Sequence, residues 1–486
     1  MRILYIDIDS LRPDHLGCYG YQRNTSPNID SVANRGARCT NYYCSDAPCL
    51  PSRTALFTGR LGIHTGVINH GGLEADIRPQ GAGRMFGNRG PYCSFMQTIR
   101  NAGYYTVMFS PFATRHAAWH VLDGFREVHD SGGNGNETAD EVAPAAIRWL
   151  TERAKEDNWF VHVNFWDPHC PYRTPLDYGN PFEDDPAPDW LTDEIIAEQR
   201  ETFGPHSACD LAGWGPCDSE KWPRVPPEIT NRDDFKKWID GYDTGIHYAD
   251  KYVGQLLETL DEQGVLEDTF VIISADHGEN QGELNVYGDH QTADNITCRV
   301  PFIIAGPGII RECVDAAFHY NVDMAPTITE LVRGKPAEKW DGHSFLSNLT
   351  DWGNVGRNYL VVSQGAWACQ RAVRFDNWIL IRTYHDGFKD FPELMLYDIE
   401  GDPHETRNLA NDMHDVVGRG LWILDHWQGE MMSCSDFATD PMWHVIAEGG
   451  PFHVRKRMDE YLKHLHATDR SMAAIRLSKK HGGDSD

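Results

Sequence analysis

The sequence predicts an α/β fold, in which a large, mostly parallel sheet is sandwiched by helices and a smaller antiparallel sheet follows toward the C-terminus. Near-continuous apolar segments alternate with helical patterns over most of the chain, which is typical of parallel strands buried on both faces. Closely spaced strand patterns appear only from about residue 355. The 486 residues exceed what one minimal core needs. We therefore expect one domain over residues 1–350 and a C-terminal subdomain over residues 351–486, with a helical tail.

The strand predictions depend on short apolar runs. Four runs are expected in the large sheet and four in the small one, at 3–6, 103–109, 159–165 and 269–274, and then at 359–363, 371–374, 378–382 and 394–398. Residues 176–235 are rich in Pro and Asp with little periodicity, and we interpret them as a long insertion that could wall a pocket. Ligand groups of an open α/β sheet are expected where its strands end.

Composition excludes several classes of partner. The formal net charge of −28 argues against nucleic acid, because phosphate binding requires clustered Lys and Arg. No apolar run approaches the roughly 18 residues that span a bilayer, so we expect no membrane insertion. A strand begins within one residue of Met1 and leaves no room for a signal peptide, and the 12 cysteines show no regular framework. We expect a cytoplasmic protein with mostly reduced thiols.

The most informative stretch is Cys49-Leu50-Pro51-Ser52-Arg53, which continues as Thr-Ala-Leu-Phe-Thr-Gly-Arg up to Arg60. It resembles the maturation signature of type I sulfatases, in the alkaline-phosphatase-like superfamily. In that family an activating enzyme, the formylglycine-generating or sulfatase-maturating enzyme, converts the cysteine into formylglycine. The hydrated aldehyde then supplies the hydroxyl that attacks sulfur. The alternative is a buried structural cysteine beside a proline turn.

The resemblance also implies a metal site. Asp9 ends the first strand, and Asp276-His277 follows the fourth, as in the metal segments of the family. Asp9, Asp276, His277 and the formylglycine oxygen from Cys49 would bind one divalent cation. Mostly oxygen ligands favour Ca²⁺ or Mg²⁺, with Ca²⁺ the first expectation, and the imidazole permits Mn²⁺ or Zn²⁺.

The chain departs from the family pattern inside this metal site. Ser10 stands where the family has a second Asp, and Asp7 could be a poor substitute for it. Asp9 alone could also be a helix N-cap, and Asp-His-Gly occurs by chance in loops.

Three further residues are assigned roles by the resemblance. His169, after the third strand, corresponds to the histidine that protonates the departing alcohol. His290 stands where the family has a sulfate-binding Lys, so we expect its charge to depend on pH. Arg53 lies one helical turn from Cys49, with a helix N-terminus near Ser52, and is expected to stabilise an oxyanion on residue 49. For His169 the alternative is a histidine packed in a Pro-rich turn, and for His290 it is a surface histidine in a polar loop.

A Gly-Lys-Trp-His sequence that most relatives carry after the second strand is absent, and Ser110-Pro111-Phe112-Ala113 stands in its place. Arg115, His116 and His120 lie just downstream and could refill the space, although each could simply cap a helix. We take Arg115 and His116 as candidate substrate-binding residues, and Arg115 or Arg173 could hold a carboxylate.

The function expected is hydrolysis of a sulfate monoester, on a sulfated sugar or an acidic oligosaccharide fragment imported into the cell. Aromatic residues make up 11% of the chain and offer stacking surfaces for a sugar. Two alternatives stay open. One is a phosphonate monoester or phosphodiester hydrolase of the same superfamily, favoured by the single leading Asp and the missing Lys. The other is a non-catalytic binding protein in which Cys49 is never oxidised.

Overall fold

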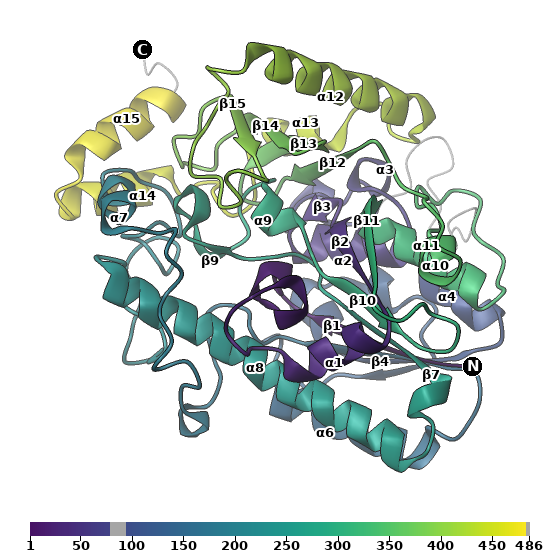
Figure 1. The fold of residues 1–486 in the computed structure, drawn as a ribbon. Helices are drawn as coiled ribbons and strands as arrows, with labels where there is room; N and C mark the ends of the chain where they lie inside the picture. The colour runs from purple at the N-terminus through teal and green to yellow at the C-terminus, as the bar shows by residue number, and fades with distance from the viewer. Residues whose placement is uncertain (78–93, 483–486) are drawn as a thin grey trace.

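The computed structural model describes residues 1–77 and 94–482 and centres on an eight-stranded sheet (Figure 1). Its strand order is β11-β2-β10-β7-β1-β6-β4-β5, and every pairing is parallel except those of β10 with its two neighbours. The bounds are β1 Arg2–Ile8, β2 Ala37–Tyr43, β4 Tyr105–Phe109, β5 Glu127–His129, β6 Trp159–Phe165, β7 Thr269–Ser274, β10 Phe302–Ala305 and β11 Cys313–Tyr320. The predicted fold class is confirmed.

The four strands predicted for this sheet are its contiguous centre, β7-β1-β6-β4. Ile3 pairs with Phe160 on one side and with Phe270 on the other, and the side chains of β6 and β7 are buried along their whole length. Burial on both faces explains why these segments are almost continuously apolar.

Two groups of helices cover the sheet (Figure 1). In one, α8 contacts both α1 and α6, and in the other α2, α4 and α10 contact one another. The bounds are α1 Pro27–Arg35, α2 Cys49–Thr58, α4 Phe95–Asn101, α6 Ala139–Arg153, α8 Arg232–Glu262 and α10 Met324–Leu331. The side chain of Asn231 caps α8, accepting from the backbone N–H groups of Asp233 and Asp234. A capping box of Thr138 and Glu141 begins α6.

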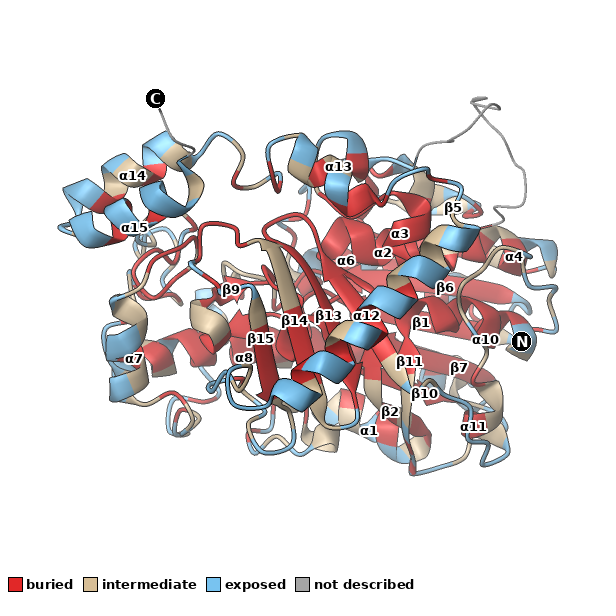
Figure 2. Ribbon diagram, turned by 90° about the horizontal axis from the view of Figure 1, so that it is seen from above, coloured by how far each residue is buried: buried red, intermediate tan, exposed pale blue. Residues whose placement is uncertain are grey.

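The small sheet has the order β15-β14-β13-β12-β3. Its antiparallel strands are β12 Tyr359–Gln364, β13 Cys369–Phe375, β14 Trp378–His385 and β15 Leu394–Asp398. The fifth strand, β3, comes from Asp46–Ala47 and pairs in parallel with β12. Figure 2 shows α12, His414–Cys434, lying across this sheet with an exposed outer face. The strand directly before Cys49 is therefore part of the C-terminal sheet.

The predicted insertion carries little regular structure beyond α7, Asp193–Arg200, and the start of α8. Its buried Asp210 accepts from Arg470, Tyr461 and His464, which ties it to α14, Met458–Ala467, and to the segment before α15, Ser471–His481. Shorter elements are α3 Gly62–Thr65, α5 Phe112–His116, α9 Asn295–Cys298, α11 Leu346–Thr350, α13 Pro441–Ala447, β8 Asn280–Gln281 and β9 Tyr287–Asp289. Among the described residues, no helix has the length and apolarity to cross a membrane.

Candidate active site

The carboxyl ends of β1 and β7 bring the two predicted metal segments together. Asp9 directly follows β1, and Asp276 and His277 follow β7, its parallel neighbour. All three side chains are almost completely buried. The Ser10 backbone N–H donates to Asp276 Oδ1 at 3.3 Å, and Ser10 Oγ donates to Asp9 Oδ1 at 3.0 Å. The serine that replaces the second Asp thus orients both remaining carboxylates.

Cys49 is the first residue of α2 and projects into the same place. Its Sγ lies 3.0 Å from His277 Nε2 and 4.0 Å from His290 Nε2, and the residue is 2% exposed. One ligand atom each from Asp9, Cys49, Asp276 and His277 lie within 4.8 Å of one another. The helix begins at Cys49 and not near Ser52 as expected, and Ser52 Oγ donates instead to the Asp276 carbonyl.

The Arg53 guanidinium lies among carboxylates. It contacts Asp276 at 3.1 Å and Asp9 at 3.0 Å, and it also contacts Asp7. Its polar contacts therefore go to the acids that surround Cys49. Asp7 bonds to Arg53 and, at 3.2 Å, to His162, and it is not one of the four clustered ligand residues. Its expected use as a substitute ligand finds no support in this geometry.

The charges around Cys49 suit a divalent cation. Among the described residues, Asp7, Asp9 and Asp276 share the single buried guanidinium of Arg53, so two negative charges are left over when all three acids are ionised. Burial raises the pKa of Asp276 to about 7, although Arg53 opposes the rise. Burial alone would also raise the pKa of Asp9, but His169, which is protonated at the acid pH where Asp9 titrates, and Arg53 outweigh it and hold that pKa well below its usual range. A cation in this cluster would let both ligand acids ionise; the two carboxylates suit Ca²⁺ or Mg²⁺, and the imidazole suits Mn²⁺ or Zn²⁺.

Both predicted functional histidines lie beside this cluster. The His290 ring is 4.0 Å from that of His277 and 5.6 Å from that of His169, measured between centroids. The carboxylate of Asp289 accepts from the His290 backbone N–H at 2.7 Å and pairs with His206 of the insertion at 2.8 Å. The insertion thus helps to build the site through His206.

The surroundings of His290 shift its pKa and that of His169 in the ligand-free protein. Burial, followed by the proximity of His277, lowers the pKa of His290 well below its usual value. Burial also lowers the pKa of His169 to about 4. Both rings are therefore neutral near pH 7 before substrate binds, because the low-dielectric interior disfavours the imidazolium.

Of the three candidate residues downstream of β4, His116 and Arg115 pack on aromatic rings, whereas His120 bonds to a side chain of α2. His116 packs on Phe112, with 4.7 Å between ring centroids, and Phe112 lies 4.8 Å from Arg53 Cζ. Arg115 lies over the Trp166 ring at 5.1 Å and donates to the Asn134 carbonyl at 3.2 Å. His120 is bonded to Thr54 Oγ1 at 2.8 Å, outside the cluster around Cys49.

Sequence reasoning missed two histidines near His116. The His70 ring is 5.1 Å from that of His116, and His70 Nδ1 is 2.9 Å from His453 Nε2. His453 in turn stacks on Trp367 of the C-terminal sheet region, with 4.4 Å between centroids. Neither residue belongs to a motif, and 383 positions separate them, so no local signal could have found the pair.

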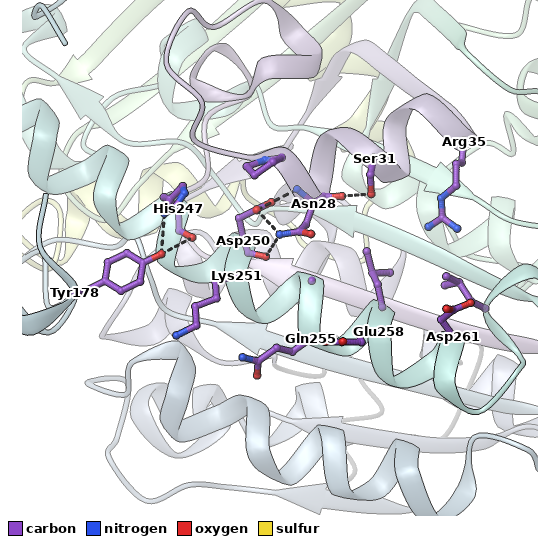
Figure 3. A pocket seen from close by; sticks show the side chains of 14 residues that line it. Asn28, Ser31, Arg35, Tyr178, His247, Asp250, Lys251, Gln255, Glu258 and Asp261 are labelled. Atoms are coloured by element: carbon purple, nitrogen blue, oxygen red, sulfur yellow. Dashed lines mark hydrogen bonds between the residues drawn. The ribbon is translucent and has the colours of Figure 1, made fainter. Parts of the chain in front are cut away.

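Two other features of the described residues lie away from this site. Cys39, Asp315 and His319 cluster on β2 and β11, but the Asp315 carboxylate already bonds to His319 at 2.9 Å and to Asn348 at 2.8 Å. A hollow of about 650 Å³ lies between α1 and α8 (Figure 3). None of the predicted site residues lines it. Its Asp250 accepts from the backbone N–H of Ile29 and of Asn28 in the first turn of α1, which is a structural role.

Comparison with known proteins shows the family to which the chain belongs. The sequence model of the sulfatase family matches residues 2–334. The choline-sulfatase of Rhizobium meliloti is 26% identical over 446 residues, covering 81% of this chain and 79% of that protein. The chain belongs to the sulfatase family, a family of sulfuric ester hydrolases.

Solved structures share the fold at low identity. A 2-O GAG sulfatase superimposes with a TM-score of 0.69 at 20% identity, over 88% of this chain and 92% of that one. The phosphonate monoester hydrolase of Agrobacterium radiobacter gives 0.68 at 19% identity, over 88% and 96%. These likenesses support the alkaline-phosphatase-like fold predicted from the sequence.

Proposed function

We propose that the protein hydrolyses a sulfate monoester at residue 49, after Cys49 has been converted into formylglycine. The observation that carries the proposal is the position of Cys49 Sγ within 4.8 Å of ligand atoms from Asp9, Asp276 and His277. These residues would hold a divalent cation, which supplies positive charge for an anionic ester in a chain of net charge −28. A hydrated formylglycine supplies the nucleophilic hydroxyl.

The protein's own residues would orient the ester and move one proton. Arg53 holds the carboxylates of Asp9 and Asp276 in place through its contacts with both. His290 Nε2, 4.0 Å from Cys49 Sγ, is placed to donate a hydrogen bond to a sulfuryl oxygen. The His169 Nδ1–H is engaged by the Cys170 carbonyl, so His169 Nε2 is the atom that would protonate the leaving oxygen. The negative charge of a bound ester favours the imidazolium form that this step needs.

For the substrate we propose a sulfated sugar, with an acidic sugar preferred. Arg173 and Arg115 are the two cations that could bind the sugar carboxylate: burial lowers the pKa of Arg173, and Arg115 lies over the Trp166 ring. A carboxylate would form a charge-assisted hydrogen bond with either guanidinium and would offset the desolvation of Arg173. One structural relative is itself described as a 2-O GAG sulfatase.

Activity on an aryl sulfate and a sugar sulfate, together with mass spectrometry of the residue 49 peptide, tests the proposal. We expect formylglycine in the peptide and turnover of at least one sulfate ester. His169→Ala should impair poor leaving groups far more than activated aryl esters, whereas His290→Ala should impair both. If both substitutions impaired both substrates equally, neither histidine would have the role proposed for it.

A phosphonate monoester or phosphodiester hydrolase is the second candidate. Ser10 in place of an acid and His290 in place of a Lys support it, as does the fold likeness to a phosphonate monoester hydrolase. Relative kcat/KM on aryl sulfate and aryl phosphonate esters separates the two functions.

A binding protein with an unmodified Cys49 is the third candidate. A residue 49 peptide with intact cysteine, from protein co-expressed with a maturating enzyme, would favour it. The cytoplasmic location stays a prediction.

A further inference from the structure

The loop that carries His169 connects β6 to Tyr172, and both backbone polar groups of its Cys170 are bonded. The Cys170 carbonyl accepts from His169 Nδ1, and a carbonyl oxygen can only accept, so Nδ1 carries the hydrogen in this contact. The His169 backbone N–H donates to the Trp166 carbonyl at 2.7 Å. The tautomer and direction of the His169 ring therefore depend on where the Cys170 carbonyl points.

The Cys170 backbone N–H is held by a carboxylate from another segment. Glu279, two residues after His277, accepts this N–H with Oε2 at 3.2 Å. Its Oε1 accepts from Tyr172 Oη at 3.0 Å and from Gln281 Nε2 at 3.1 Å. The Glu279 side chain is completely buried. One carboxylate thus bonds to both ends of the short segment from Cys170 to Tyr172.

The partners of Glu279 are themselves held by other buried side chains. Gln281 Oε1 accepts from Trp238 Nε1 of α8 at 2.5 Å and lies 3.0 Å from Tyr172 Oη, whose single hydrogen lies between Gln281 and Glu279. Tyr172 packs edge-on against Trp238, with 5.1 Å between centroids. Burial raises the pKa of Glu279 to about 8, but the contact with Cys170 does not depend on the charge, because the unprotonated oxygen of a carboxylic acid still accepts an N–H.

We propose that Glu279 is a positioning residue for proton transfer: by holding the backbone N–H of Cys170 it fixes the residue whose carbonyl sets the tautomer of His169, and so keeps His169 Nε2 directed at the leaving oxygen. The inference deepens the proposed function and depends on His169 acting there. It joins the segment of Asp276 and His277 to the segment of the proton donor through one side chain. A side chain with a purely structural role would affect all substrates alike, whereas this one acts on the leaving-group step.

Two near-isosteric substitutions at Glu279 form the test. Glu279→Gln keeps an oxygen that can accept the Cys170 N–H, and Glu279→Met fills similar space without an acceptor. Tyr172→Phe is the matched control, because it removes a different donor to Glu279 and leaves the contact with Cys170. Circular dichroism first establishes that each variant is folded at the assay temperature.

The kinetic readout compares 4-nitrophenyl sulfate, an activated ester, with a 2-sulfated methyl hexuronoside, whose leaving group is an alkoxide. For Glu279→Met we expect kcat/KM to fall about 100-fold on the sugar sulfate and less than about threefold on the aryl ester, since general acid catalysis contributes about 10²–10⁴-fold and matters most for poor leaving groups. Glu279→Gln and Tyr172→Phe should keep the wild-type ratio between the two substrates. Equal losses on both substrates in Glu279→Met, or the same loss in Glu279→Gln, would overturn the proposal.

A structural readout keeps the inference separate from the proposed function. In crystal structures, the contact between His169 Nδ1 and the Cys170 carbonyl should persist in Glu279→Gln and be lost in Glu279→Met. An unchanged His169 in Glu279→Met would overturn the positioning role even in an active enzyme. A wild-type protein that hydrolyses neither ester would instead overturn the proposed function, and the comparison of structures would still decide whether Glu279 positions His169.

Discussion

Replacing Arg53 by Met tests the electrostatic arrangement around Cys49. The guanidinium is 1% exposed and contacts Asp7, Asp9 and Asp276 at once. Removing one partner of a buried ion pair costs about 3–5 kcal/mol, because the remaining charge stays buried without compensation. Here three carboxylates lose their shared cation, so we expect the upper part of this range, with Arg53→Lys less severe because it keeps the charge but not the planar fork.

The expected shift in melting temperature follows from the size of the chain. Unfolding entropy is roughly 2.1 cal/mol/K per residue, which gives about 1 kcal/mol/K for 486 residues. Arg53→Met should therefore lower Tm by about 4–5 °C in thermal unfolding followed by circular dichroism. Added Ca²⁺ or Mn²⁺ should restore part of the loss, because a bound divalent cation replaces the missing positive charge.

Arg382→Met serves as the matched control. Its side chain is 41% exposed and lies 3.6 Å from Glu393, and exposed pairs contribute only about 0–1 kcal/mol. We expect its Tm to stay within about 1 °C of the wild type. An Arg53→Met protein that melts within the same interval, with or without a divalent cation, would refute the view that this guanidinium offsets the three acids.

Three further predictions address the nucleophile, the cation and a remote carboxylate. Cys49→Ala should abolish turnover and leave the thermal unfolding curve nearly unchanged, and appreciable multiple turnover in that variant would contradict the mechanism. Chelation with EDTA should remove activity and lower Tm, and readdition of Ca²⁺, Mg²⁺ or Mn²⁺ should restore both, whereas activity that survives exhaustive chelation would exclude the metal site. Asp250 (Figure 3) has its pKa raised to about 6 by burial, so its contribution to stability is complete below the unfolded pKa of about 3.9 and is lost as pH rises through 6. The Tm of Asp250→Asn relative to that of the wild type should therefore rise between pH 4 and pH 7, by at most about 3 °C. A Tm difference that does not change with pH would show that burial does not raise the pKa of Asp250.

Sequence patterns predicted the four central strands of the large sheet and missed its other four, including β10, which is buried throughout but has only four residues. The runs that became β1, β4, β6 and β7 are apolar along their length because helices cover both sides. By contrast, β2 alternates buried and partly exposed positions irregularly, and β5 has only three residues. The antiparallel direction of β10 follows from how the chain returns after α9, which periodicity does not encode.

The candidate site shows the same division between local and assembled features. Cys49, Asp9, Asp276 and His277 each belong to a short motif at a strand or helix end, and the structure brings all four together. His70 and His453 belong to no motif and meet only because the C-terminal region folds over the site. The pKa values of His169 and His290 likewise depend on burial, which a sequence does not specify.

The small sheet does more than append a subdomain to the large one. Ser363 of β12 donates its backbone N–H to the Ser45 carbonyl at 2.9 Å and pairs in register with Asp46, three residues before Cys49. The next residue of β12, Gln364, donates from Nε2 to the His290 carbonyl at 2.6 Å. One strand of the C-terminal sheet thus holds the backbone just before Cys49 and the backbone at His290. Both residues come from the N-terminal part of the chain, so the C-terminal part supports the candidate site without supplying its ligand residues.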